Sequence, residues 1–184
     1  MKRLNNEQLY LISRTQKLAK IAVLVSLATV LNTLENTYLP PMFPWLRIGL
    51  ANIVTLIAII LFGIKGGVVV AGLRGVLSSL LRGSLFSPAF ILGFSGGVIS
   101  AIVMAIFYKV GKKIFSFIGI SIIGAVANNL TQIVVAYFIL IKHTGCFYLV
   151  PLFLLSSLVT GFFNGVVVIY LNKQLQLSAF GYQP

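Results

Sequence analysis

Glu35 is the residue around which a functional site can be assembled. The chain has two acidic residues against 14 lysines and arginines, and the other acid, Glu7, lies in a charged N-terminal segment. Glu35 precedes a proline-rich stretch between two long apolar runs, and proline resists continuation of a helix. In that stretch, Arg47 can attract an anion and Trp45 can cover a flat ligand. We therefore expect this loop to form the mouth of a binding site.

Polar side chains also recur within the apolar runs. An amide that faces lipid lacks a hydrogen-bond partner, so these side chains should point into a helix bundle. Each such bond between helices contributes only about 1 kcal/mol, so any single amide can serve merely to join two helices. As a set they predict a substrate-binding pocket whose residues are Glu35, Trp45, Arg47, Asn52, Arg74, Ser95, Asn129, Gln132 and Asn164.

Arg74 falls near the middle of an apolar run, where a charge costs several kcal/mol. Ser78 and Arg82 follow at four-residue steps, so a helix presents all three residues on one face. Two interpretations remain open. Either Arg74 pairs structurally, with Glu35 or with carbonyl groups at a helix end, or Arg74 or Arg82, together with Arg47, binds an anionic group of a ligand. The scarcity of acids favours a ligand that is anionic or bears a carboxylate.

The residue types that are missing exclude several enzyme classes. The chain contains no aspartate, so it lacks the paired aspartates that hold magnesium for prenyl transfer or phosphotransfer. One histidine and one cysteine cannot form a His-Glu-x-x-His zinc site or a multi-cysteine metal site. No P-loop motif for ATP is present. We therefore expect a chain that is not an enzyme, with no catalytic residue, no metal and no cofactor of its own.

The composition indicates an integral membrane protein. The chain is 59% hydrophobic and 9% charged, and its mean hydropathy is +1.05. A soluble domain of this composition would expose a very large apolar surface. The net charge of +12 would suggest nucleic acid in a soluble protein. Here the basic residues lie mostly between apolar runs, so we expect the lipid bilayer as a partner and no nucleic acid.

A helix needs about 20 apolar residues to cross a bilayer. The apolar runs predict an all-α bundle of six transmembrane helices, at residues 18–34, 48–64, 66–82, 88–108, 116–141 and 148–171. A turn at Lys65-Gly66-Gly67 separates the second helix from the third. The distribution of lysine and arginine predicts that both termini are cytoplasmic and that the Glu35 loop faces outward. The predicted organisation is a basic segment at 1–17, a membrane domain at 18–172 and a short cytoplasmic tail at 173–184.

One stretch of sequence resembles the signature of a known family. Glu35 is followed by Pro40-Pro41 and then by Leu46-Arg47-Ile48-Gly49-Leu50-Ala51-Asn52-Ile53-Val54. This stretch is similar to the signature of the Gx transporter family, also described as heptaprenyl diphosphate synthase component I. The later Arg74-Gly75 and Gly93-Phe94-Ser95-Gly96-Gly97 also resemble the family pattern. The likeness extends over roughly residues 15–172.

The resemblance implies a role like that of the S components of energy-coupling factor (ECF) transporters. Those proteins have six helices, capture a vitamin-like molecule in an outward pocket, and dock onto a transmembrane T protein with two ATPases that use ATP. Their docking face typically carries Ala-x-x-x-Ala in the first helix, and here Ala22 and Ser26 take those positions, with serine as a departure.

Two functions follow as expectations. The first is substrate capture for an importer in the bacterial cytoplasmic membrane, with a vitamin-like molecule or an isoprenoid or quinone precursor as ligand. The second is a non-catalytic membrane scaffold for enzymes of isoprenoid or quinone biosynthesis, in which the polar side chains only join helices.

Overall fold

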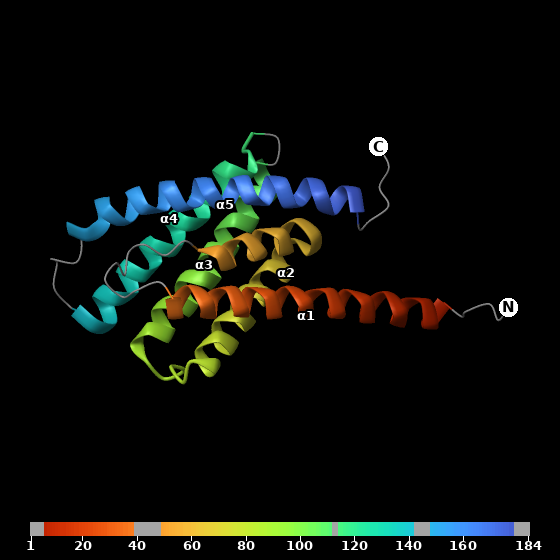
Figure 1. Ribbon diagram of the computed structural model, residues 1–184, viewed down its shortest axis with the longest axis horizontal. Coiled ribbons are helices and arrows are strands. Elements are labelled where there is room, and N and C mark those ends of the chain that lie inside the picture. The colour runs from red at the N-terminus through yellow and green to blue at the C-terminus, as the bar shows by residue number, and fades with distance from the viewer. Residues whose placement is uncertain (1–5, 39–48, 112–113, 142–147, 179–184) are drawn as a thin grey trace.

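The computed structural model of the protein is all-α, as predicted, and describes residues 6–38, 49–111, 114–141 and 148–178 (Figure 1). In this part of the chain the helices are α1 (Asn6–Tyr38), α2 (Leu50–Leu81), α3 (Pro88–Gly111), α4 (Phe117–Ala136) and α5 (Val150–Ser178). A π-helical turn, η1 (Tyr137–Ile141), continues α4. Each of these five helices contains a segment long and apolar enough to cross a membrane. The structure thus agrees with a multi-pass membrane protein.

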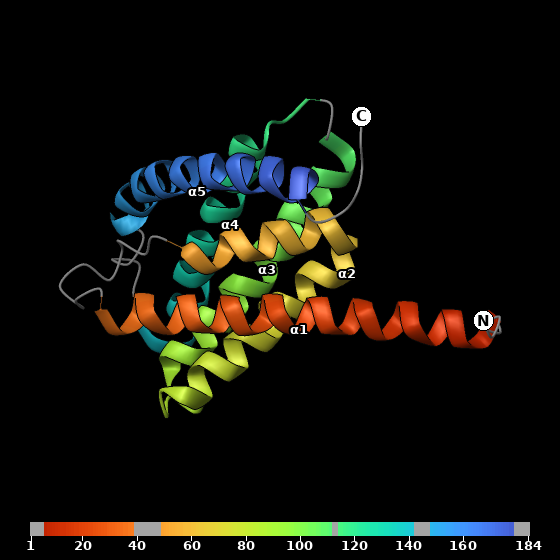
Figure 2. The ribbon, with the colours of Figure 1, turned by 45° about the vertical axis from the view of Figure 1, so that its right-hand side comes forward.

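Helix α2 is not straight but doubles back on itself at Gly63. The φ of 72° and ψ of −164° at Gly63 are non-helical, and a positive φ is readily adopted only by glycine. Figure 2 shows the two arms of α2, orange before the bend and yellow to green after it. The predicted spans 48–64 and 66–82 therefore correspond to two arms of one element, at 50–62 and 64–81. The number of membrane crossings and their orientation stay predictions.

The predicted position of the break, Lys65-Gly66-Gly67, is wrong by a few residues. Gly66 and Gly67 already belong to the second arm, where they allow it to pack closely after the bend. A Cβ atom at Gly66 would lie 2.3 Å from Cβ of Phe62, and one at Gly67 would lie 2.3 Å from Cγ1 of Ile59. The glycine pair is thus explained by close packing rather than by a turn.

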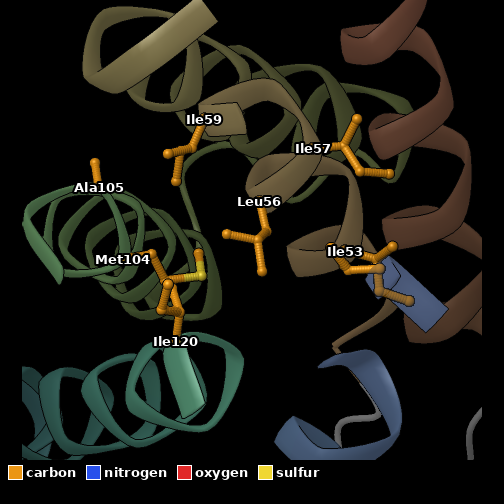
Figure 3. Close-up of a cluster of buried hydrophobic side chains, with 8 residues drawn as sticks. Ile53, Leu56, Ile57, Ile59, Met104, Ala105 and Ile120 are labelled. Atoms are coloured by element: carbon orange, nitrogen blue, oxygen red, sulfur yellow. The ribbon is translucent and has the colours of Figure 1, made fainter. Parts of the chain in front are cut away.

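A cluster of buried apolar side chains joins four helices, with Val168 contributed by α5 (Figure 3). Leu56 and Ile59 come from α2, Met104 from α3 and Ile120 from α4, and each is 1% exposed. Gly124 of α4 leaves room for Met104, because a Cβ atom there would lie 2.4 Å from its Cγ. This cluster fixes the positions of α2, α3 and α4, each of which contributes residues to the lining of the candidate site.

Helix α1 packs against α2 through a second apolar cluster that includes Val25, Ala28 and Val70. Its N-terminal part extends beyond the bundle (Figures 1 and 2). A helix of 33 residues is about 50 Å long, which exceeds the hydrocarbon core of about 30 Å. The predicted domain boundaries, after residue 17 and after residue 172, both fall inside continuous helices, α1 and α5.

Candidate functional site

A polar cavity of about 130 Å³ lies between α1, α2, α3 and α4. We refer to it as the arginine cavity. Polar side chains from three of these helices line it, together with phenylalanines and small residues of α3. The polar lining residues are Asn32, Glu35, Asn36, Asn52, Arg74, Ser78, Ser79, Arg82, Asn128 and Gln132. Four of the predicted site residues, Glu35, Asn52, Arg74 and Gln132, thus line one cavity.

The bend in α2 brings Arg74 to Asn52. Each of these residues is eleven positions from Gly63, which places both about 17 Å along their arms from the bend. Nη2 of Arg74 donates a hydrogen bond of 2.8 Å to Oδ1 of Asn52. Helix α3 leaves space for the guanidinium at Gly97, where a Cβ atom would lie 3.3 Å from Nη2. The position of Arg74 therefore depends on two glycines. The bend at Gly63 brings it to Asn52, and Gly97 of α3 leaves space for its guanidinium group.

Arg74 is a cation in a nearly enclosed position, with only 7% of its surface exposed. Among the described residues, no carboxylate lies within the 4.0 Å that defines a salt bridge to it, and Glu35 attracts it only from a greater distance. A guanidinium has five N–H donors, and Asn52 accepts from one nitrogen. Because Arg74 borders the cavity, its other donors are available to a bound group. Such a site favours an anion with oxygen acceptors.

Glu35 has a clear structural partner, the start of α2. Its Oε1 accepts from the backbone N–H of Gly49 at 2.6 Å, and its Oε2 accepts from that of Leu50 at 3.1 Å. Gly49 is the N-cap of α2, in a left-handed conformation with φ of 71°. The first N–H groups of a helix lack partners within the helix, and the helix dipole favours a negative charge there. Glu35 therefore holds the end of α1 against the beginning of α2.

The hydroxyl of Ser78 joins α1 to the second arm of α2. Nδ2 of Asn32 donates to Oγ of Ser78 at 2.8 Å, and Nε of Arg82 donates to the Ser78 carbonyl at 3.1 Å. Arg74, Ser78 and Arg82 all line the cavity. The polar stripe that the four-residue spacing predicted thus forms one wall of the arginine cavity.

Three predicted site residues do not line this cavity. Asn129 instead donates to Oγ of Ser157 at 2.8 Å and so joins α4 to α5. The hydroxyl of Ser95 donates to the carbonyl of Ile91 in its own helix at 2.7 Å. Asn164 donates from Nδ2 to the carbonyl of Gly49 at 3.3 Å, so it supports the start of α2 from α5.

The other four predicted residues are two loop residues and the two residues of the predicted docking face. Trp45 and Arg47 lie outside the described residues. Ala22 and Ser26 lie on an exposed face of α1, where the Ser26 hydroxyl donates to the Ala22 carbonyl at 3.0 Å. Their role in docking stays a prediction.

Six polar lining residues are absent from the predicted set of site residues, namely Asn32, Asn36, Ser78, Ser79, Arg82 and Asn128. The sequence signal for Asn128 is the Gly93-Phe94-Ser95-Gly96-Gly97 run of α3. A Cβ atom at Gly96 would lie 2.6 Å from Oδ1 of Asn128, so that glycine lets the amide approach. Among the described residues, no group of three or more histidine, cysteine or acidic side chains could hold a metal ion.

The comparison with protein families gives one match over most of the chain. Residues 24–171 match the family described as heptaprenyl diphosphate synthase component I. The comparison with curated proteins finds no match, and neither does the comparison with solved structures. The matched range contains all four helix segments that line the arginine cavity and the stretch from Glu35 to Asn52. The chain belongs to the heptaprenyl diphosphate synthase component I family, as that stretch predicted.

Proposed function

We propose that this protein is the substrate-capture subunit of an ATP-dependent importer. The arginine cavity would bind the anionic end of a vitamin-like molecule or of an isoprenoid or quinone precursor. The observation that carries the proposal is the buried Arg74, which borders a polar cavity without a carboxylate at salt-bridge distance among the described residues. Leaving a cation in such a place is costly unless an anion completes it.

The charge of the cavity supports an anionic ligand. Two arginines, Arg74 and Arg82, line it together with one carboxylate, Glu35. Both oxygens of Glu35 accept backbone N–H groups of α2, so this carboxylate already has its partners. The net positive charge and the neutral amides around it suit a carboxylate or phosphate group.

The size of the cavity limits what enters it in this conformation. Its 130 Å³ is the share of about four water molecules in the liquid, whereas pockets for whole drug-sized ligands measure about 300–1,000 Å³. The cavity therefore fits the charged end of a ligand rather than a complete vitamin. A larger ligand requires a wider opening between the helices.

In this proposal the energy for import comes from partner chains. An ECF-type T protein and two ATPases would dock onto the membrane-embedded subunit, and ATP would be hydrolysed on the ATPases. Ala22 and Ser26 offer a face of α1 that this chain leaves exposed, next to Val23 and Leu27. The bacterial cytoplasmic membrane, with both termini inside, is the proposed location.

A second candidate function rests on the description of the family. That description names a component of heptaprenyl diphosphate synthase, which suits a membrane scaffold for a synthase without catalysis by this chain. Contacts such as that between Asn129 and Ser157 join helices without any ligand. If the protein is a scaffold, the polar residues of the arginine cavity would likewise join helices and bind no ligand.

Purification from the native host in mild detergent, followed by native mass spectrometry, separates the two functions. Substrate capture predicts a reproducible bound small molecule with an anionic group, and co-purification of a T protein with two ATPases. The scaffold predicts synthase subunits on a protein without a bound small molecule. The second pattern would overturn the import proposal.

A further inference from the structure

A second cavity, of about 540 Å³, lies at the bend of α2. Lysines from three helices line it, namely Lys17 of α1, Lys65 of α2 and Lys109 of α3. We refer to it as the lysine cavity. Gly63 also lines it, whereas Arg74 lies about 17 Å along the second arm. The lysine cavity is therefore separate from the arginine cavity.

The chain provides little negative charge to balance these three lysines. It has two acidic residues in total, and Glu35 already caps α2. Glu7 lies ten residues before Lys17 on α1, which is about 15 Å along a helix. Lys17, Lys65 and Lys109 are exposed, so their ammonium groups are accessible. An anion from outside the chain would relieve the repulsion among them.

The walls between the lysines are mostly apolar. Ile59, Phe62, Ile64 and Ala105 line the cavity, together with Tyr108. The volume lies within the range of about 300–1,000 Å³ that is usual for ligand pockets. Lysine side chains commonly place an apolar stem along such walls and the charge at the membrane interface. Ammonium groups beside an apolar wall fit an amphiphile, with an anionic head and a hydrocarbon chain.

The bend adds a further preference for an anion. The second arm of α2 begins just after Gly63, and Ile64 and Lys65 of its first turn line the cavity. The N-terminus of a helix carries a partial positive charge and N–H groups without helical partners. Together with the lysines from α1 and α3, this start makes the wall of the cavity strongly positive.

We propose that the lysine cavity binds a membrane lipid whose headgroup is a phosphate monoester, with its hydrocarbon chain along the apolar wall. Three ammonium groups balance a doubly charged phosphate monoester better than a singly charged phosphodiester. The site is independent of the ligand in the arginine cavity, so either assignment can fail without the other.

The test is native mass spectrometry of the full chain in mild detergent, titrated with phosphatidic acid, with phosphatidylglycerol or with inorganic phosphate. Phosphatidic acid should bind at least about fivefold more tightly than phosphatidylglycerol. Lys65→Ala should weaken the binding of phosphatidic acid about fivefold, which is the usual contribution of one lysine near an anionic lipid. Replacing Lys17, Lys65 and Lys109 together by alanine should abolish the preference. Lys65→Arg preserves the charge, so this variant should retain the preference for phosphatidic acid.

Lys173→Ala is the matched control, because Lys173 is an exposed lysine of α5 that does not line the cavity. It should leave the preference for phosphatidic acid unchanged. Equal affinity for the two lipids would overturn the proposal, as would a preference that survives the triple replacement. Displacement of phosphatidic acid by an equal concentration of inorganic phosphate would overturn the assignment to a lipid.

Discussion

Replacing Glu35 by glutamine tests whether the carboxylate holds α1 to α2. The two side chains have nearly the same shape, so the change removes the charge without creating a cavity. One oxygen of glutamine can still accept from Gly49 or Leu50. The amide NH₂ group, however, is a donor and cannot accept from the other backbone N–H. We expect the free energy of unfolding to fall.

The contacts give the size of this loss. A hydrogen bond to a charged group contributes about 1.5–3 kcal/mol, roughly 1 kcal/mol more than a neutral one. Oε1 and Oε2 of Glu35 make two such bonds, at 2.6 and 3.1 Å, and a charge at a helix N-terminus adds up to about 1 kcal/mol. With one bond weakened and one lost, we expect Glu35→Gln to destabilise the protein by about 2–4 kcal/mol.

The assay is unfolding in mixed micelles, in which denaturing detergent is titrated and helix content is followed by circular dichroism. Thr37→Ala is the control, because Thr37 is an exposed neighbour at the same end of α1 and such surface changes usually stay within about 0.5 kcal/mol. A Glu35→Gln protein as stable as the Thr37→Ala protein would refute the assignment of Glu35 as the cap of α2.

Three further predictions concern the bend, the core and the docking face. Gly63→Ala should destabilise the protein by about 1–3 kcal/mol, because a φ of 72° with a ψ of −164° is adopted almost only by glycine, and the backbone is the whole cause, since nothing lies within 4 Å of a Cβ atom there. Gly72→Ala, at an equally open position without a positive φ, should not destabilise it, and equal effects in the same unfolding titration would argue against a strained bend. Ser100→Ala removes a buried hydrogen bond of 2.8 Å to the Gly124 carbonyl and should cost about 0.6 kcal/mol in that titration; no change would show that this bond does not stabilise the α3–α4 contact. Replacing Ala22 and Ser26 by leucine should reduce co-purification of a T protein while ligand retention stays unchanged, and normal co-purification would place docking elsewhere.

The helices and their apolar character could be predicted because long apolar runs dominate the sequence. The break in α2 was misplaced for a physical reason. Lys65-Gly66-Gly67 has the composition of a turn, but the positive φ that makes the bend falls on Gly63. The glycine pair serves close packing against Phe62 and Ile59. Composition alone does not distinguish these two uses of glycine.

Part of the candidate site could be predicted, because the position of a residue along its helix indicates its depth in the membrane. Which side of a helix faces the cavity does not follow as easily. Asn128 and Asn129 are neighbours, yet Asn128 lines the cavity and Asn129 bonds to α5. Adjacent positions differ by about 100° around a helix axis, so the packing of α3 and α5 decides between them. The capping role of Glu35 depends on a contact across fourteen residues, which no local pattern reveals.

The most direct test of substrate capture is the comparison of bound ligand in the wild-type and Arg74→Gln proteins by native mass spectrometry after identical purification. Glutamine keeps a polar N–H donor but carries no charge, so the proposal predicts that an anionic small molecule retained by the wild type is lost from Arg74→Gln. Asn129→Ser, a change that lies outside the cavity lining, should keep the ligand. Equal retention by the wild-type and Arg74→Gln proteins would contradict the assignment of Arg74 as the anion-binding residue.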